Sequence, residues 1–178
     1  MIDKNIRSYS SMFPKEYTEL RLQENRSNGV ALLNGDVVSN SQSAASGVSA
    51  RIFKDGHWGF ASNPNISDSA VESVIRSSTD NVRFLNKRDN SRCGIMLPET
   101  FINFEKDFTS QKQKNSQKHW LDFLKTLDNY ILNKYPKITS RTIVIRSLDM
   151  EKSLLTATGS TSYSMTPRAH LMINLSAD

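Results

Sequence analysis

Residues 47–62 read Gly-Val-Ser-Ala-Arg-Ile-Phe-Lys-Asp-Gly-His-Trp-Gly-Phe-Ala-Ser, and this stretch decides the fold around it. Asp55-Gly56 is a two-residue hairpin signal, because the favoured tight turn needs positive φ at both positions. Beyond the turn, Gly59 stands between Trp58 and Phe60, and a glycine inside a strand marks a bulge or the close approach of another backbone. The stretch therefore predicts two short antiparallel strands joined by a tight turn.

The residues before this hairpin predict further strands. Residues 17–23 alternate along the chain, and Asn28-Gly29 and Asn34-Gly35 are turn dipeptides. Residues 17–62 are therefore expected to form an antiparallel meander of about four or five strands. Within it, residues 39–46 are small and polar, which favours a strand at the edge of the sheet or one that faces a partner.

Three segments have the apolar spacing of helices, residues 3–13, 67–85 and 116–135. Asp3 and Ser67 are candidate N-caps for the first two.

The rest of the chain completes an α+β pattern. Residues 86–115 are polar with scattered aromatics, and we interpret them as a long connection. Residues 141–175 return to strand patterns, with Gly159 as a turn. We expect a single domain over residues 1–178, with a helix, a β-meander and a helix in residues 1–85 and a helix plus strands in residues 116–178. The predicted fold is a largely antiparallel, curved sheet packed by two or three helices.

Composition excludes several classes of protein. The net charge of +5 comes from 23 basic and 18 acidic residues without a concentrated stripe, so nucleic acid is a disfavoured partner. The single Cys93 excludes an intrachain disulfide framework. No apolar run is long enough to span a bilayer, and residues 1–7 lack the apolar core of a secretory signal. We therefore expect a cytoplasmic protein that does not bind membranes.

The sequence contains no recognisable catalytic motif. Nucleotide-binding glycine motifs and a serine nucleophile elbow are absent, and His57, His119 and His170 lie far apart without metal-ligand spacing. Trp58 and Phe60 faintly match the stacking strand of an RNA-recognition motif, but Asp55 occupies the place of a basic residue. RNA binding is therefore kept only as a minor alternative.

Several spaced elements resemble the N-terminal signature of the TldD/PmbA family, the metallopeptidase-like proteins known as modulators of DNA gyrase. They are the leading helix, Tyr17-Thr18-Glu19-Leu20-Arg21, Asn34-Gly35, Gly47-Val48-x-x-Arg51, the run from Asp55 to Ser62 and the helix that begins at Ser67. The resemblance covers residues 1–85 well and is looser over residues 86–178. The signature residues, read as mostly structural, are Gly47, Arg51, Asp55, Gly56, Trp58, Gly59 and Phe60. For Arg51, pairing with Glu19 or Glu24 is favoured over a position facing a substrate chamber.

The resemblance implies a function for a longer protein. Family members are cytoplasmic zinc metallopeptidases that process peptides or unfolded segments, and they assemble as dimers of identical or related subunits. Their zinc ligands, on a His-Glu-x-x-x-His helix and a later cysteine, belong to a C-terminal domain that is absent from this sequence. No catalytic or metal residue is therefore assigned here, and this chain alone is expected to be inactive. The implied role is a dimerising, substrate-gating N-terminal domain, with a non-catalytic partner subunit as the alternative.

One stretch is a candidate for substrate contact. Ser43, Ala44 and Ala45 have no bulky side chain to block an extended peptide from pairing with the strand. The alternative is that these residues form an ordinary solvent-exposed strand. The sequence stops just after the apolar strand at residues 170–175, and we expect it to be part of a longer protein.

Overall fold

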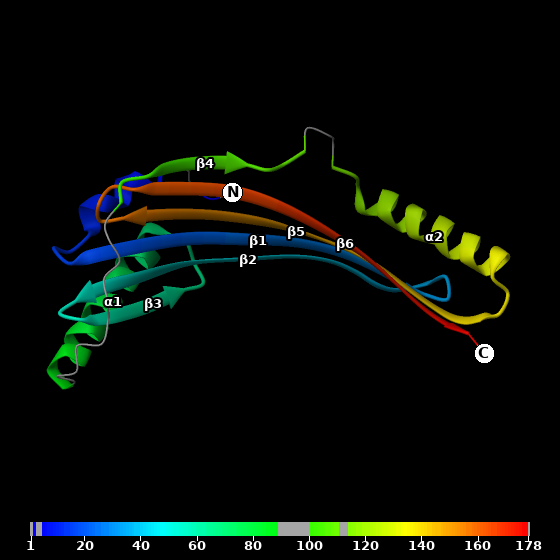
Figure 1. Ribbon diagram of the computed structural model, residues 1–178, viewed down its shortest axis with the longest axis horizontal. Coiled ribbons are helices and arrows are strands. Elements are labelled where there is room, and N and C mark those ends of the chain that lie inside the picture. The colour runs from blue at the N-terminus through cyan, green and yellow to red at the C-terminus, as the bar shows by residue number, and fades with distance from the viewer. Residues whose placement is uncertain (1, 3–4, 89–99, 111–113, 178) are drawn as a thin grey trace. The chain divides into compact units, whose positions relative to one another are not determined.

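The computed structural model describes residues 2, 5–88, 100–110 and 114–177. Its elements, labelled in Figure 1, are the 3₁₀ helix η1 (Ile6–Met12), the helices α1 (Asp68–Arg88) and α2 (Gln117–Lys134), and the strands β1 (Tyr17–Leu33), β2 (Asp36–Lys54), β3 (His57–Asn63), β4 (Asn103–Asp107), β5 (Ile138–Thr156) and β6 (Thr161–Ala177). The strands form one mostly antiparallel sheet in the order β3-β2-β1-β5-β6-β4. The predicted α+β class with an antiparallel sheet and up to three helices is confirmed.

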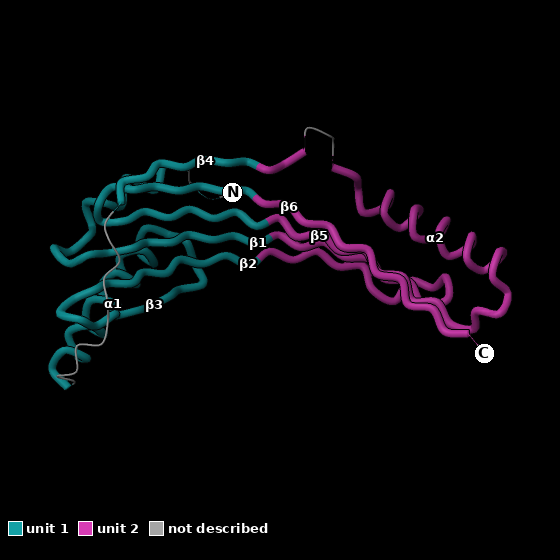
Figure 2. The backbone as a smooth tube through the Cα atoms, in the orientation of Figure 1, with its two compact units in different colours: residues 1–25, 45–107, 150–165 teal, residues 26–44, 108–149, 166–178 magenta. Residues whose placement is uncertain are grey.

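The chain forms two compact units, coloured separately in Figure 2. Unit 1 comprises residues 1–25, 45–107 and 150–165, and unit 2 comprises residues 26–44, 108–149 and 166–178. The four long strands β1, β2, β5 and β6 each contribute residues to both units. Each unit has its own core.

The core of unit 1 lies between the sheet and two helices, α1 and η1. Alternate residues of β1 and β2 point to this side, and they meet the apolar face of α1. The central members are Leu20, Leu22, Val48, Ala50, Ile52, Val71, Val74 and Val82. Ser67 caps α1 as predicted, because its Oγ accepts a hydrogen bond from the N–H of Ala70 at 3.2 Å.

Gly59 brings α1 against β3. A Cβ atom built at Gly59 would lie 2.1 Å from the carbonyl oxygen of Ser78 and 2.7 Å from the backbone nitrogen of Val82. Both neighbours are backbone atoms, so they cannot turn aside as a flexible side chain can. The predicted close approach of another backbone at Gly59 is therefore confirmed, and the approaching backbone is that of α1.

The core of unit 2 lies between α2 and the sheet. Leu124 and Ile131 of α2 pack with three buried residues of β1 and β5, Val30, Leu32 and Ile143. Ser116 caps α2, because its Oγ accepts a hydrogen bond from the N–H of His119 at 3.2 Å.

A buried ion pair joins α2 to the sheet in unit 2. Nε of Arg141 on β5 donates to Oδ1 of Asp128 on α2 at 2.9 Å, and both side chains are almost wholly buried. The backbone N–H of Arg141 donates to Oδ1 of Asn34 at 2.8 Å, which ties the turn between β1 and β2 to β5. Removing either charge would leave the other buried without a partner, so the pair fixes the position of α2.

Two of the predicted turns are confirmed and one is wrong. Asn34 and Gly35, between β1 and β2, have φ of 51° and 89°. Asp55 and Gly56, between β2 and β3, have φ of 49° and 87°. Both pairs therefore have the positive φ that a tight two-residue turn requires. Asn28-Gly29, expected as a turn, lies inside β1 instead. Residues 17–62 therefore form three strands, two of them long, rather than the four or five that were expected.

The remaining differences concern short elements. The expected helix over residues 3–13 is the 3₁₀ helix η1, too short for a stable α-helix, and Asp3 lies outside the described residues. The expected connection over residues 86–115 contains β4, which pairs in parallel with the start of β6. All five residues of β4 are exposed, so it lacks the buried alternation that identifies a strand in a sequence.

Replacing Gly59 by alanine tests the close approach of α1 to β3. We expect Gly59→Ala to lower the free energy of unfolding by about 3 kcal/mol or more, because the backbone of α1 must move to accept the methyl group. Urea denaturation followed by circular dichroism measures this loss. Gly29→Ala is the matched control, because its Cβ would have only ordinary contacts at 3.6 Å, with Cγ of Arg146 and Oγ of Ser41. Equal stability of the two variants would contradict the close approach.

Candidate functional site

The signature residues lie on the hairpin of β2 and β3 in unit 1. The two strands pair in register, with Arg51 opposite Phe60, Ile52 opposite Gly59 and Phe53 opposite Trp58. Ile52 and Gly59 face α1, so strand alternation puts Arg51, Trp58 and Phe60 on the other face of the sheet. The hairpin therefore presents the large side chains of the signature away from the helices.

Trp58 is the centre of an aromatic cluster on this face. Its ring meets the ring of Tyr17 edge-on at 6.0 Å between centroids and the ring of Phe53 at 5.0 Å. The guanidinium of Arg51 lies over the Trp58 ring, 4.6 Å from its centroid. Such contacts are cross-strand packing, so this ring is engaged by protein neighbours. Tyr17 was not predicted to join this cluster, although the alternation of residues 17–23 puts it on the same face of β1 as Glu19 and Arg21.

Arg51 pairs with Glu19, the first of its two predicted partners. Nε and Nη2 of Arg51 donate to the two carboxylate oxygens of Glu19 at 2.5 and 2.9 Å. This pairing raises the pKa of the Arg51 guanidinium. At the turn end of the hairpin, the hydrogen bond from Lys54 lowers the pKa of Glu16. Glu19 lies on β1 and Glu16 directly precedes this strand, so these ion pairs hold β1 and β2 together.

The three signature glycines also have structural roles. Gly56 adopts the positive φ of the turn, and Gly59 receives the backbone of α1. A Cβ atom at Gly47 would lie 2.9 Å from the carbonyl oxygen of Asn63, at the end of β3. Phe60 differs from these residues, because 59% of it is exposed and it lines an open groove with Arg21 and Ser62.

The candidate substrate strand lies on an open edge of β2. The ladder between β2 and β3 begins at Val48, and the other neighbour of β2 in the sheet is β1. Among the described residues, no strand therefore lies beside β2 from Asp36 to Gly47 on the β3 side. Ser43 and Ala44 lie in the part of β2 that belongs to unit 2, Ala45 belongs to unit 1, and all three are exposed.

The side chain of Gln117, at the start of α2, touches this edge at one point. Its Nε2 donates to the carbonyl oxygen of Ser41 at 3.2 Å, and its Oε1 accepts a hydrogen bond from Gln42 at 2.9 Å. No such contact is recorded at Ser43 or Ala44 within the described chain. These two residues are thus the accessible part of the predicted strand in unit 2.

The described residues contain no group of three or more His, Cys, Asp or Glu side chains arranged to hold a metal ion. His57 lies in β3 and His170 in β6, while His119 lies in the first turn of α2. Likewise, none of the helices that the structure describes is long and apolar enough to cross a membrane. Cys93 lies outside the described residues.

The fold is an open, mostly antiparallel sheet packed by helices, with a tight hairpin that depends on Gly56 and Gly59. Residues 18–82 match the sequence profile of PmbA/TldA metallopeptidase domain 1. The matched segment contains the whole hairpin and most of α1. Residues 18–82 therefore correspond to the first domain of the TldD/PmbA family, as the signature residues predict. A search of curated proteins gives no match.

Solved structures share the fold over nearly the whole chain. A candidate modulator of DNA gyrase from Bacteroides thetaiotaomicron matches with a TM-score of 0.76 and 14% identity, over 100% of this chain and 42% of its own. TldE from Thermococcus kodakarensis matches with a TM-score of 0.69 and 13% identity, over 97% of this chain and 38% of its own. A candidate modulator of a DNA gyrase from Thermotoga maritima matches with a TM-score of 0.55 and 14% identity, over 90% of this chain and 39% of its own. The chain thus spans about two fifths of the length of these proteins.

Proposed function

We propose that this chain is the dimerising, substrate-gating domain of a TldD/PmbA-type zinc metallopeptidase that processes peptides or unfolded protein segments. The observation that carries the proposal is the open edge of β2 in a chain whose residues 18–82 match the first domain of this family. The domain binds and orients the substrate, whereas bond cleavage belongs to a part of the protein outside this chain.

An extended peptide fits the open edge because the backbone of an edge strand has unpaired N–H and C=O groups. A peptide that pairs with them gains hydrogen bonds that do not depend on its sequence. Ser43, Ala44 and Ala45 suit such pairing because they are small and uncharged, whereas exposed edges are usually blocked by charge or proline. The edge is therefore suited to many different unfolded segments.

Zinc is proposed for the complete protein and not for the described residues of this chain, whose His, Cys, Asp and Glu side chains do not gather into a metal-binding group. When bound in the remainder of the protein, the metal would supply the activated water for hydrolysis. The role of this chain would be the same in a non-catalytic partner subunit, the alternative that the sequence leaves open.

A second open edge supports assembly with an identical or related subunit. β4 pairs with β6 only as far as Met165, so in the described part of the sheet no strand lies beside residues 166–177 of β6 on that side. This stretch exposes Leu171, Met172, Ile173 and Leu175. A long apolar edge strand is a template for pairing with another chain. The proposed compartment is the cytoplasm, a reducing environment in which the single cysteine of this chain needs no disulfide partner.

Proline substitutions at two neighbouring residues test the peptide edge. Successive backbone N–H groups of a strand point to opposite edges of that strand. One of the two variants, Ala44→Pro and Ala45→Pro, therefore removes a hydrogen-bond donor from the open edge, and the other removes a donor from the ladder with β1. We expect the variant that keeps the wild-type melting temperature to lose binding of an unfolded peptide by about tenfold, measured by fluorescence anisotropy.

The two variants control for one another, because the ladder-facing proline reports general damage to the sheet. Full peptide binding by the variant that keeps its melting temperature would overturn the proposed role of the edge.

Lysine substitutions on β6 test the assembly. Leu171→Lys with Ile173→Lys places charge on the apolar edge, and we expect light scattering to show a shift from dimer to monomer. Leu132→Lys, on the exposed face of α2, is the control and should leave the mass unchanged. A wild-type protein that is monomeric at every concentration would contradict the proposed dimer.

A further inference from the structure

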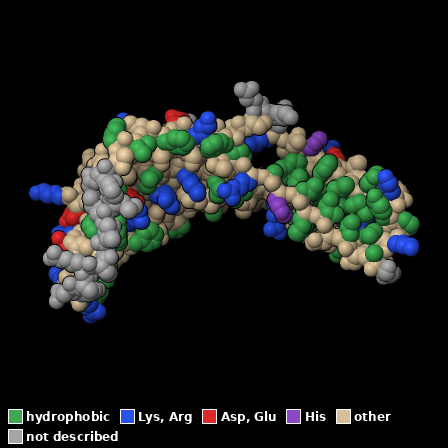
Figure 3. All heavy atoms as spheres, viewed as in Figure 1, with side chains coloured by type: hydrophobic (Ala, Val, Ile, Leu, Met, Phe, Trp, Pro, Cys, Tyr) green, Lys and Arg blue, Asp and Glu red, His purple; other side chains and the backbone are tan. Residues whose placement is uncertain are grey.

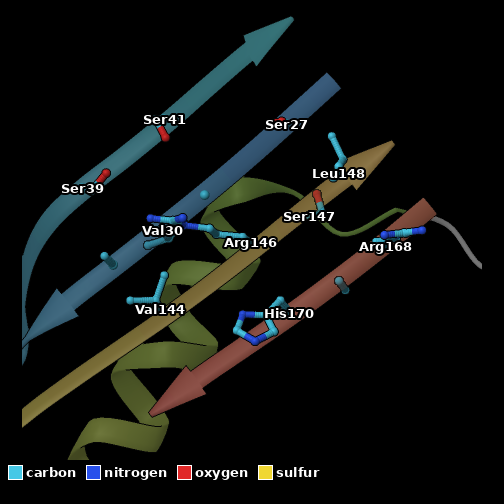
Figure 4. Close-up of a pocket in the computed structure, with 13 residues that line it drawn as sticks. Ser27, Val30, Ser39, Ser41, Val144, Arg146, Ser147, Leu148, Arg168 and His170 are labelled. Atoms are coloured by element: carbon cyan, nitrogen blue, oxygen red, sulfur yellow. The ribbon is translucent and has the colours of Figure 1, made fainter. Parts of the chain in front are cut away.

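A cavity lies on a face of the unit 2 sheet that α2 does not cover. Its volume is about 490 Å³, and four strands contribute to its lining. In Figure 4, Ser39 and Ser41 come from β2, Ser27 from β1, Arg146 from β5, and Arg168 and His170 from β6, with α2 behind the strands. We call this cavity the basic trough.

The basic side chains of the trough have no acidic neighbour in its lining. Arg146, Arg168 and His170 are all exposed, and neither Asp nor Glu is among the residues that line the trough. Within the described chain, neither arginine forms an ion pair. Two carboxylates of this unit are paired elsewhere, Asp128 with Arg141 and Asp149 with Lys114. The positive charge of the trough is therefore available to a ligand.

Small residues give the trough its floor. A Cβ atom built at Gly29 of β1 would lie 3.6 Å from Cγ of Arg146 and 3.6 Å from Oγ of Ser41. The stem of Arg146 thus passes close to the backbone of β1, and the serine hydroxyls beside it add donors and acceptors. This combination of cations and hydroxyls suits a ligand that has both carboxylates and backbone amides.

The charge of the whole chain is concentrated in this unit. Unit 2 contains ten lysines and arginines against five aspartates and no glutamate, whereas unit 1 contains thirteen basic and thirteen acidic residues. The net charge of +5 therefore belongs entirely to unit 2. Figure 3 shows one face of the molecule, with Lys and Arg side chains over both units. The difference in net charge between the units arises mainly from the acidic residues, thirteen in unit 1 and five in unit 2. A net positive unit attracts anionic ligands and speeds their association.

We propose that the basic trough binds an acidic segment of polypeptide, so that the domain prefers substrates with glutamate or aspartate near the segment that is processed. The inference rests on the proposed peptide-binding function and adds a class of substrate to it. Arginine forms strong charge-assisted hydrogen bonds with carboxylates, and two arginines on neighbouring strands can hold two carboxylates of one extended segment.

Polypeptide is favoured over single-stranded nucleic acid because of the lining. Proteins that bind single strands stack the bases on aromatic side chains, and no Phe, Tyr or Trp lines the trough. Trp58 lies in unit 1, where Tyr17, Phe53 and Arg51 engage its ring. Serine and arginine without aromatic platforms match carboxylates and amides better than bases.

The test compares two labelled peptides that differ only in charge. A glutamate-rich peptide and its counterpart with glutamine in place of every glutamate are titrated with the full chain, and anisotropy gives both dissociation constants. We expect the acidic peptide to bind about tenfold tighter at low salt, with the preference falling as salt increases. Arg146→Gln with Arg168→Gln should abolish the preference.

The matched control removes the same amount of charge from exposed lysines elsewhere in unit 2. Lys125→Gln with Lys137→Gln should keep the preference, because neither residue lines the trough. Both arginines are exposed, and circular dichroism of each variant verifies its fold. If the arginine pair fails to fold, Arg168→Glu alone should still reverse the preference.

The outcomes separate this inference from the proposed function. Equal binding of the two peptides by the wild-type protein would overturn the proposed preference of the trough for acidic segments, while leaving the proposed peptide-binding edge intact. Binding of neither peptide would overturn both proposals. Displacement of the acidic peptide by polyuridine at lower concentration than by the unlabelled acidic peptide would show a nucleic-acid surface and overturn the assignment to polypeptide. Displacement by low concentrations of inorganic phosphate would likewise reduce the trough to a simple anion site and overturn it.

Discussion

The missing side chain of Gly59 is the constraint on which the signature hairpin depends. Because the backbone of α1 at Ser78 and Val82 occupies the place of a Cβ atom, β3 must turn Gly59 toward the helix. Strand alternation then sends Trp58 and Phe60 to the opposite face. The signature thus specifies how one helix and two strands pack, and the large side chains are displayed as a consequence. This explains how a family signature can be distinctive without containing catalytic groups.

In unit 2, a buried ion pair rather than a glycine sets how the helix packs on the sheet. The buried pair of Asp128 and Arg141 joins α2 to the sheet, and the apolar residues around Leu124 and Ile143 fill the space between them. The acidic partners that remain in this unit are few, so the charge of the arginines on the uncovered face is not cancelled. The face that α2 covers contributes stability, while the uncovered face and the open strand edges are the surfaces that we propose to contact other polypeptides.

The parts of the fold that local chemistry decides were predictable from the sequence. Asn34-Gly35 and Asp55-Gly56 need positive φ, and Ser67 precedes a clear apolar period. Asn28-Gly29 was misread because the same dipeptide also fits within a long strand when neighbouring strands supply its hydrogen bonds. The basic trough was not predictable. Arg146 and His170 line the same cavity only because β5 and β6 are neighbours in the sheet, and in the sequence each resembles an ordinary surface residue.

Amide hydrogen exchange of the full chain, with and without an excess of an unfolded peptide, tests the central claim most directly. If a substrate segment pairs with the sheet as an added strand, the backbone amides of β2 between Asp36 and Gly47 must exchange more slowly when the peptide is present. The account predicts protection in this stretch and unchanged exchange in the ladder between β2 and β3. Unchanged exchange from Asp36 to Gly47, under conditions in which the peptide is bound, would contradict it.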